Sequence, residues 1–223
     1  MQNPLLQNAL RAHQAGNLAE AARLYSEGLR ADPGNALGFF LFGMLHFEAG
    51  ALDNASRLFD EAVRLDPRFP EVLHQRGNLL MNSGRLQEAL ANYDQALRIK
   101  PDVAEVLNAK GLALTQLGRA EEAMAFYDRA LALKPDFAAV FNNQGNALLG
   151  LQRYAEAVAS YDRALAAHPN YADAIANRSL GLYFLGRYDE ALAAFVRVAV
   201  LAPHNGDAFA NRGICLVAMG RPV

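Results

Sequence analysis

The residues with the most suggestive spacing in this sequence are asparagines. Asn143, Asn177 and Asn211 follow one another at intervals of 34 residues. An asparagine amide both donates and accepts hydrogen bonds, so a row of such amides could hold a peptide backbone without reading its side chains. The alternative interpretation is that these amides only stabilise neighbouring helices. The residues alone leave both interpretations open.

Motifs for catalysis and for metal binding are missing from the sequence. The segment 145–150 has glycines at the spacing of a phosphate-binding loop, but no Lys-Ser or Lys-Thr follows it. No two of the five histidines lie four residues apart, as two metal ligands on one helix face would. Cys215 is the only cysteine, which excludes an intrachain disulfide and a cysteine-based zinc site. We therefore expect no enzymatic activity, no metal and no cofactor.

Composition narrows the class of protein further. Apolar residues make up 52% of the 223 residues and charged residues 20%, which excludes a disordered chain. The formal net charge is −2, so the basic excess of a dedicated nucleic-acid binder is absent. No run of about 20 apolar residues could span a membrane, and the first residues do not resemble a signal peptide. We expect a soluble, cytoplasmic protein that binds no nucleic acid and does not insert into membranes.

An internal repeat of 34 residues organises the whole chain. Six prolines mark its period: Pro33, Pro67, Pro101, Pro135, Pro169 and Pro203. If each proline is counted as position 32, a single array spans residues 2–223. Its repeats are 2–35, 36–69, 70–103, 104–137, 138–171 and 172–205, followed by the half-repeat 206–223.

The repeat columns predict a helical hairpin. Position 20 is always alanine, position 24 is always aromatic, and position 8 is always small. Position 15 is glycine in every repeat except at Gln152, as expected for a residue that ends a helix with positive φ. We therefore expect a first helix at about positions 2–14 and a second at about 18–31, which the proline ends. Such hairpins bury their apolar faces only by stacking, which predicts an all-α solenoid.

These columns resemble the tetratricopeptide repeat family. The family pattern has a large residue at position 4, small residues at 8 and 20, an aromatic at 24 and proline at 32, and the resemblance covers residues 2–223. The chain departs from the pattern because it has no tryptophan, and because position 7 is polar at Arg76, Lys110 and Gln144. The resemblance implies a right-handed α-solenoid superhelix of about six and a half tandem helix-turn-helix repeats.

The resemblance also implies a function and a surface for it. Members of the family are protein- or peptide-binding scaffolds, and the first helix of each repeat lines a concave groove through positions 2, 5, 6, 9, 12 and 13. We expect an extended peptide or a partner protein in this groove. The polar residues there are His74, Asn78, Asn108, Asn142, Asn143, Asn146, Asn177 and Asn211.

The first two repeats place apolar residues at the same positions. These are Leu6, Leu10, Leu37, Phe40, Leu41, Met44 and Phe47. They predict either a surface for an apolar partner or amphipathic helix, or a self-association surface. Along the groove, a peptide carboxylate would be repelled by Glu71, Glu105, Asp173 and Asp207, so we expect a neutral or basic ligand.

A second resemblance supplies an alternative function. The repeats are similar to those of bacterial O-linked N-acetylglucosamine transferase-like proteins, in the segment from His13 to Ala21 and in Tyr-Asp-Arg-Ala-Leu. That family uses a similar asparagine ladder to grip substrate peptides. The alternative is therefore the N-terminal substrate-recognition region of a larger glycosyltransferase-like enzyme. The last helix, with Ile214, Leu216 and Val217, is too apolar to end an array. We expect either a longer protein or self-association through this helix.

Overall fold

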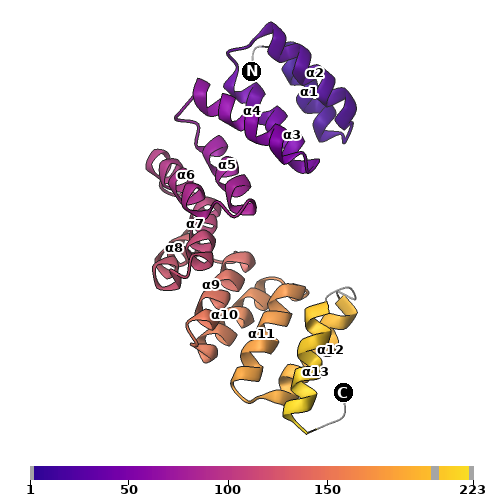
Figure 1. Ribbon diagram of the computed structural model, residues 1–223, viewed down its shortest axis with the longest axis vertical. Coiled ribbons are helices and arrows are strands. Elements are labelled where there is room, and N and C mark those ends of the chain that lie inside the picture. Colours follow the sequence, from indigo (N-terminus) through magenta and orange to yellow (C-terminus); the bar gives the residue numbers. More distant parts are fainter. Residues whose placement is uncertain (1–2, 202–205, 221–223) are drawn as a thin grey trace. The chain divides into compact units, whose positions relative to one another are not determined.

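The computed structural model describes residues 3–201 and 206–220, although the side chains of 206–211 lie outside that description. Thirteen α-helices fill these ranges, and no strand occurs within them (Figure 1). The chain divides into two compact units, Met1–Pro101 and Asp102–Val223. We describe each unit by itself.

Both units consist of helical hairpins. The first unit contains α1 (Pro4–Gln14), α2 (Leu18–Ala31), α3 (Ala36–Glu48), α4 (Leu52–Leu65), α5 (Pro70–Asn82) and α6 (Leu86–Ile99). The second contains α7 (Ala104–Gln116), α8 (Ala120–Leu133), α9 (Ala138–Gly150), α10 (Tyr154–Ala167), α11 (Ala172–Phe184), α12 (Tyr188–Leu201) and α13 (Gly206–Ala218). The expected all-α hairpin repeat is confirmed. Each helix ends one residue earlier in the repeat than expected, within the usual uncertainty of helix boundaries.

The turn inside each hairpin is set by position 15. Gly118 has φ 75°, and the same position has positive φ in the other repeats. The amide of Arg119 donates to the carbonyl of Leu114 at 2.9 Å, and Gly118 donates to Thr115 at 3.0 Å. These two bonds satisfy carbonyls at the end of α7 that the helix leaves without a partner. Between α9 and α10 this position is Gln152, which has φ 59° although it is not glycine.

Small and aromatic residues interlock within each hairpin. A Cβ atom added to Gly111 would lie 2.6 Å from Cε1 of Tyr127, and one added to Gly43 would lie 2.6 Å from Cε1 of Phe59. Both aromatic side chains are fully buried. Position 8 is therefore small because the ring at position 24 occupies the space that a side chain would need.

The polar residues at position 7 connect neighbouring repeats. The Arg76 guanidinium lies 2.8 Å from the Asp60 carboxylate, at position 25 of the preceding repeat. Gln144 donates to Asp128 at 3.0 Å in the same way. These bonds explain why position 7 departs from the family pattern, since its side chain reaches across to the preceding hairpin.

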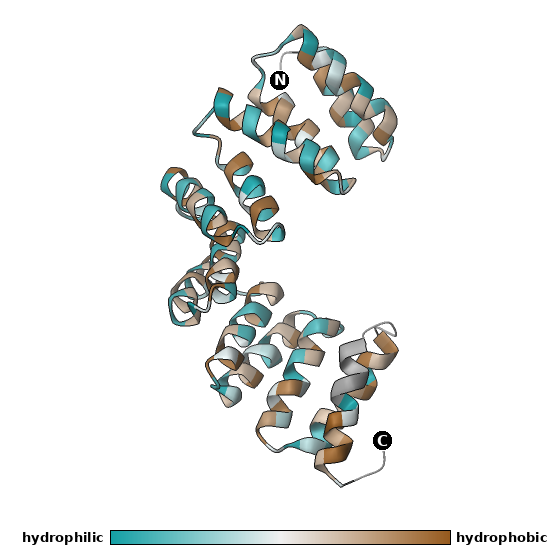
Figure 2. Ribbon diagram, viewed as in Figure 1, coloured by the Kyte–Doolittle hydropathy of each residue, from teal (hydrophilic) through white to brown (hydrophobic). Residues whose placement is uncertain are grey.

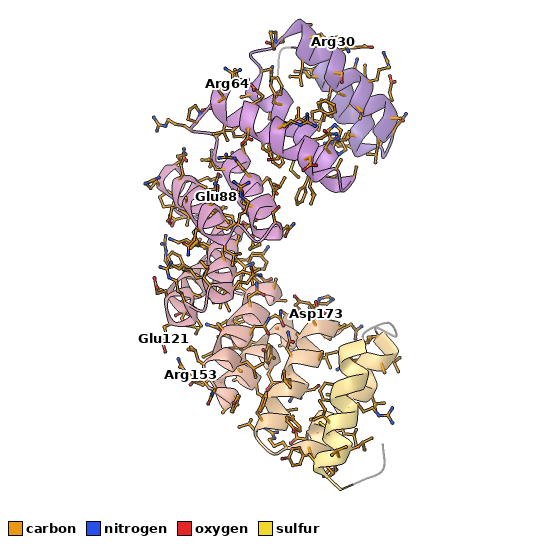
Figure 3. All side chains as sticks on the ribbon, in the orientation of Figure 1. Arg30, Arg64, Glu88, Glu121, Arg153 and Asp173 are labelled. Atoms are coloured by element: carbon orange, nitrogen blue, oxygen red, sulfur yellow. The ribbon has the colours of Figure 1, made fainter. Side chains whose placement is uncertain are left out.

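Among the described residues, the buried side chains are mostly apolar and no charged side chain is buried. Figure 2 shows hydrophilic and hydrophobic residues on different sides of many helices. Charged side chains such as Glu121 and Arg153 are exposed at the outside of the ribbon (Figure 3). Within the described ranges, no helix combines the length and hydrophobicity needed to cross a membrane.

Candidate functional site

Asparagines of the second unit form two hydrogen-bonded pairs. Asn143 of α9 donates through Nδ2 to Oδ1 of Asn108 in α7, at 3.0 Å. Asn177 of α11 donates in the same way to Asn142 of α9, at 3.1 Å. Each bond joins position 6 of one repeat to position 5 of the repeat before it. The structure thus brings four of the predicted residues together on three consecutive first helices.

The pairs leave hydrogen-bonding capacity unused. A primary amide has two donors and an acceptor with two lone pairs, and each pair consumes one donor and one lone pair. Asn108, Asn143 and Asn177 are partly exposed, whereas Asn142 is only 5% exposed. The buried Asn142 therefore fixes the orientation of the partly exposed Asn177 side chain. Asn143 and Asn177 each keep a second Nδ2 hydrogen that no bond of the pair uses.

Asn146 and Asn78 instead anchor buried tyrosines. The Tyr161 hydroxyl donates to Oδ1 of Asn146 at 2.7 Å, and the Tyr93 hydroxyl donates to Oδ1 of Asn78 at 2.8 Å. Burial raises the pKa of both tyrosines. This role was not predicted from the sequence, although an asparagine at position 9 and a tyrosine at position 24 of one repeat indicate it.

Of the remaining predicted polar residues, one lies in the first unit and one lies outside the described side chains. His74 is half-buried, with its ring 6.1 Å from that of Tyr93, and it lies with Asn78 in the first unit. The Asn211 side chain lies outside the described residues. The candidate peptide surface of the second unit therefore rests on Asn108, Asn142, Asn143 and Asn177.

The apolar residues of the first unit surround a cavity of about 360 Å³. Its lining consists of Leu10, His13, Gln14, Phe40, Leu41, Met44 and Glu48, all from α1 and α3. Leu10, Phe40, Leu41 and Met44 were expected on this surface, whereas His13, Gln14 and Glu48 were not named. Positions 12 and 13 belong to the same stripe as position 9, which is the signal that could have found them.

Leu6 and Phe47, which were predicted to lie on this surface, do not line the cavity. Leu6 is fully buried, and Cβ atoms added to Gly28 or Gly38 would lie 2.6 and 2.9 Å from its methyl carbons. The expectation that Leu6 lies on a partner surface is therefore corrected, because it fills the core between α1, α2 and α3. Phe47 is half-buried and packs against the cluster around Phe59. It does not line the cavity.

A polar rim closes one side of this cavity. His13 Nε2 lies 3.0 Å from a Glu48 carboxylate oxygen, and the Glu48 side chain is 54% exposed. The Tyr25 ring meets His13 edge to face at 6.1 Å. Burial, and then the negative charge of Glu48, raise the pKa of Tyr25 to about 12.

The described side chains contain no group of three or more His, Cys, Asp or Glu residues that could hold a metal ion. The chemistry that the two surfaces offer is recognition. One surface presents amide donors and acceptors, and the other presents an apolar hollow beside a carboxylate.

Comparison with known proteins matches this architecture. Two family models, both described as tetratricopeptide repeat, match residues 74–136, 142–205 and 179–223 in one case and residues 12–79 in the other. No curated protein matches the sequence.

Solved structures share the fold at low sequence identity. YrrB, described as a TPR protein with an unusual peptide-binding site, is 19% identical with a TM-score of 0.66, over 86% of this chain and 98% of that chain. PilW, a type IV pilus biogenesis factor, is 20% identical with a TM-score of 0.85, over 94% and 97%. A chain of the APC/C hetero-tetramer Cut9–Hcn1 is 19% identical with a TM-score of 0.84, over 95% and 42%.

Proposed function

Because the chain belongs to the tetratricopeptide repeat family, we propose that it is a non-enzymatic scaffold that holds an extended peptide on α7, α9 and α11. The observation that carries the proposal is the pair of asparagine bonds, Asn143 to Asn108 and Asn177 to Asn142. These bonds fix the side chains before a ligand arrives. Binding then costs less side-chain entropy than it would with mobile amides.

The geometry of a repeat suits an extended ligand. Packed helices lie about 8–10 Å apart, and an extended chain rises about 3.3 Å per residue. Successive amides would therefore meet a peptide at roughly every third residue. Asp173, at position 2 of its repeat, is exposed and favours a neutral or basic peptide over an acidic one, whereas Glu105 at the same position lies 3.8 Å from Lys134 Nζ.

The competing interpretation is that the asparagine pairs only join helices. The two roles differ in what a substitution changes. A purely structural pair affects the free energy of unfolding alone. A ligand-binding pair affects peptide affinity beyond any effect on stability.

The test uses peptides selected from a random-sequence display library on the intact chain. We expect the double variant Asn143→Ala/Asn177→Ala to bind them about 30-fold more weakly, since two hydrogen bonds to the peptide are lost and each contributes about 1 kcal/mol. Fluorescence anisotropy measures the affinity, and chemical denaturation measures the stability. Asn54→Ala is the matched control, because Asn54 is exposed and bonds only locally, to Arg57. Unchanged affinity in a folded double variant would contradict the proposal.

The transferase alternative is not favoured. The matching family models describe the repeat itself, and the three solved structures reported above are described by peptide binding, pilus biogenesis and a hetero-tetramer. The cytoplasmic location and self-association stay predictions. Fractionation of the source cells and light scattering of the isolated chain would check them.

A further inference from the structure

The cavity between α1 and α3 is lined in part by apolar side chains that the core does not fully bury. Phe39 and Phe42 of α3 pack on the cluster around Tyr25, and Phe47 packs on the cluster around Phe59. These contacts attach α3 to its neighbours on both sides. Phe40, Leu41 and Met44 take part in the same clusters but also line the cavity, where they remain half-buried.

The repeat lattice provides an internal comparison for these three residues. Phe40, Leu41 and Met44 occupy positions 5, 6 and 9 of their repeat. In α9 the same positions are Asn142, Asn143 and Asn146, and α9 forms an ordinary helix of the same length. A first helix of this fold can therefore have polar residues at these positions, although position 5 also serves packing: Leu6 is buried in α1, and the Phe40 ring lies 5.2 Å from that of Phe69. The half-buried Leu41 and Met44 are the clearer indication of a binding surface.

The charge at the cavity is negative. Glu48 is half-exposed, and its partner in the structure is His13. Neither arginine nor lysine lines the cavity, and α3 contains neither. Arg11, the one arginine of α1, is exposed and is not part of the lining. A cationic group of a ligand therefore complements this rim.

The apolar part of the lining favours a helical ligand over an extended one. Leu10, Phe40, Leu41 and Met44 offer no hydrogen-bond partner to a peptide backbone. An extended peptide would leave its amides unpaired against them, at a cost that a helix avoids by pairing them internally. Phe40, Met44 and Glu48 follow one another at intervals of four residues, so the hollow and the charge lie along one stripe of α3.

We propose that the α1–α3 cavity binds an amphipathic, cationic helix of a partner protein. Two large apolar side chains, one turn apart, enter the hollow beside Phe40, Leu41 and Met44. A lysine or arginine one turn further on meets Glu48. The volume of about 360 Å³ lies within the usual range of ligand pockets. The proposal is independent of the asparagine surface, which lies in the other unit and offers different chemistry.

The test uses two synthetic alanine-rich peptides of about 18 residues, long enough to be helical in water. Both have leucines one turn apart, followed one turn later by lysine in the first peptide and by glutamate in the second. We expect the lysine peptide to bind about 2- to 5-fold more tightly, as for an exposed ion pair. Glu48→Lys, a surface substitution, should reverse this preference. Equal binding of both peptides to both proteins would overturn the proposal.

A second variant tests the hollow itself. Leu41→Asn/Met44→Asn places in α3 the asparagines that α9 has at the same positions. Binding of the lysine peptide should fall at least about 10-fold, because burial of each large apolar side chain contributes about 1.5–3 kcal/mol. Circular dichroism checks that the variant is folded.

Two further outcomes separate this proposal from its alternatives. Asn143→Ala/Asn177→Ala should leave binding of the lysine peptide unchanged, so that failure of the asparagine surface is distinguishable from failure of the cavity. If the isolated chain forms dimers that Leu41→Asn/Met44→Asn abolishes, and it binds neither peptide, the cavity is a self-association surface and the proposal is wrong.

Discussion

At the residue scale, equivalent tyrosines differ in whether their hydroxyl has a partner. Tyr161 donates to Asn146, and Tyr127 lies 3.0 Å from the Thr115 hydroxyl. The Tyr25 hydroxyl is buried and has no hydrogen-bond partner among the described residues. The reason is visible in the sequence, since position 9 of the first repeat is Leu10, which cannot accept a hydrogen bond.

This difference predicts opposite effects of one substitution. Tyr161→Phe should lower the free energy of unfolding by about 0.5–1.5 kcal/mol, because a hydrogen bond to Asn146 is lost. Tyr25→Phe should leave it unchanged or raise it by up to about 1 kcal/mol, because an unpaired buried hydroxyl is removed. Urea denaturation of the two variants measures both values. Equal destabilisation would show that the Tyr25 hydroxyl has a partner in solution.

The same tyrosines predict a loss of stability at alkaline pH. Burial raises the pKa of Tyr127 to about 12 and raises those of Tyr93 and Tyr161, against about 10 in an unfolded chain. Above pH 10 the unfolded chain releases protons that the folded chain retains. The stabilisation is therefore complete below about pH 10 and is lost as pH rises towards 12.

The slope of this loss is measurable. Each buried tyrosine should contribute about 1.4 kcal/mol per pH unit in that window. Urea denaturation at pH 8, 10 and 11 gives the change in the free energy of unfolding per pH unit. Tyr127→Phe should reduce this slope by the contribution of one tyrosine. A slope that is the same in Tyr127→Phe would contradict the assignment.

At the element scale, one turn is built from an unfavourable residue. Gln152 has φ 59° between α9 and α10, where the other described hairpins have glycine with φ between 72° and 76°. A side chain at this conformation costs roughly 1–2 kcal/mol, part of which the extra backbone freedom of glycine in the unfolded chain offsets.

Gln152→Gly should therefore stabilise the chain by about 0.5–1 kcal/mol. The reverse substitution, Gly118→Gln at the same position of the previous repeat, should destabilise it by a similar amount. Thermal or urea unfolding measures both variants. If Gln152→Gly is destabilising, the Gln152 side chain makes a contact that outweighs its backbone strain.

Helices and their turns could be predicted from the sequence because their causes are local. Alanine at position 20, an aromatic at 24 and proline at 32 determine which segments pair and where they stop. The asparagine bonds could not be predicted, because Asn143 meets position 5 of the previous repeat, Asn108, and not the next asparagine of its own column. The burial of Leu6 could not be predicted either, because it depends on the close approach of Gly28 and Gly38 to this side chain.

At the scale of the whole molecule, one repeat pattern supports two kinds of surface. Positions 5, 6 and 9 are Phe40, Leu41 and Met44 in the first unit, and asparagines in α9 of the second. The division into an apolar and a polar part was predicted from these columns. The boundary of the two compact units after Pro101 was not, since it follows no change in the repeat pattern. The repeat thus fixes the hairpins and leaves the first-helix surface free to vary.

Peptide binding by the asparagine pairs can be observed in the NMR spectrum of the asparagine side-chain amides during titration with a selected extended peptide. We expect shifts for the Nδ2 protons of Asn143 and Asn177, with slower hydrogen exchange in the complex, and no change at Asn54. Peptide binding that leaves the amides of Asn143 and Asn177 unshifted would contradict the proposed function.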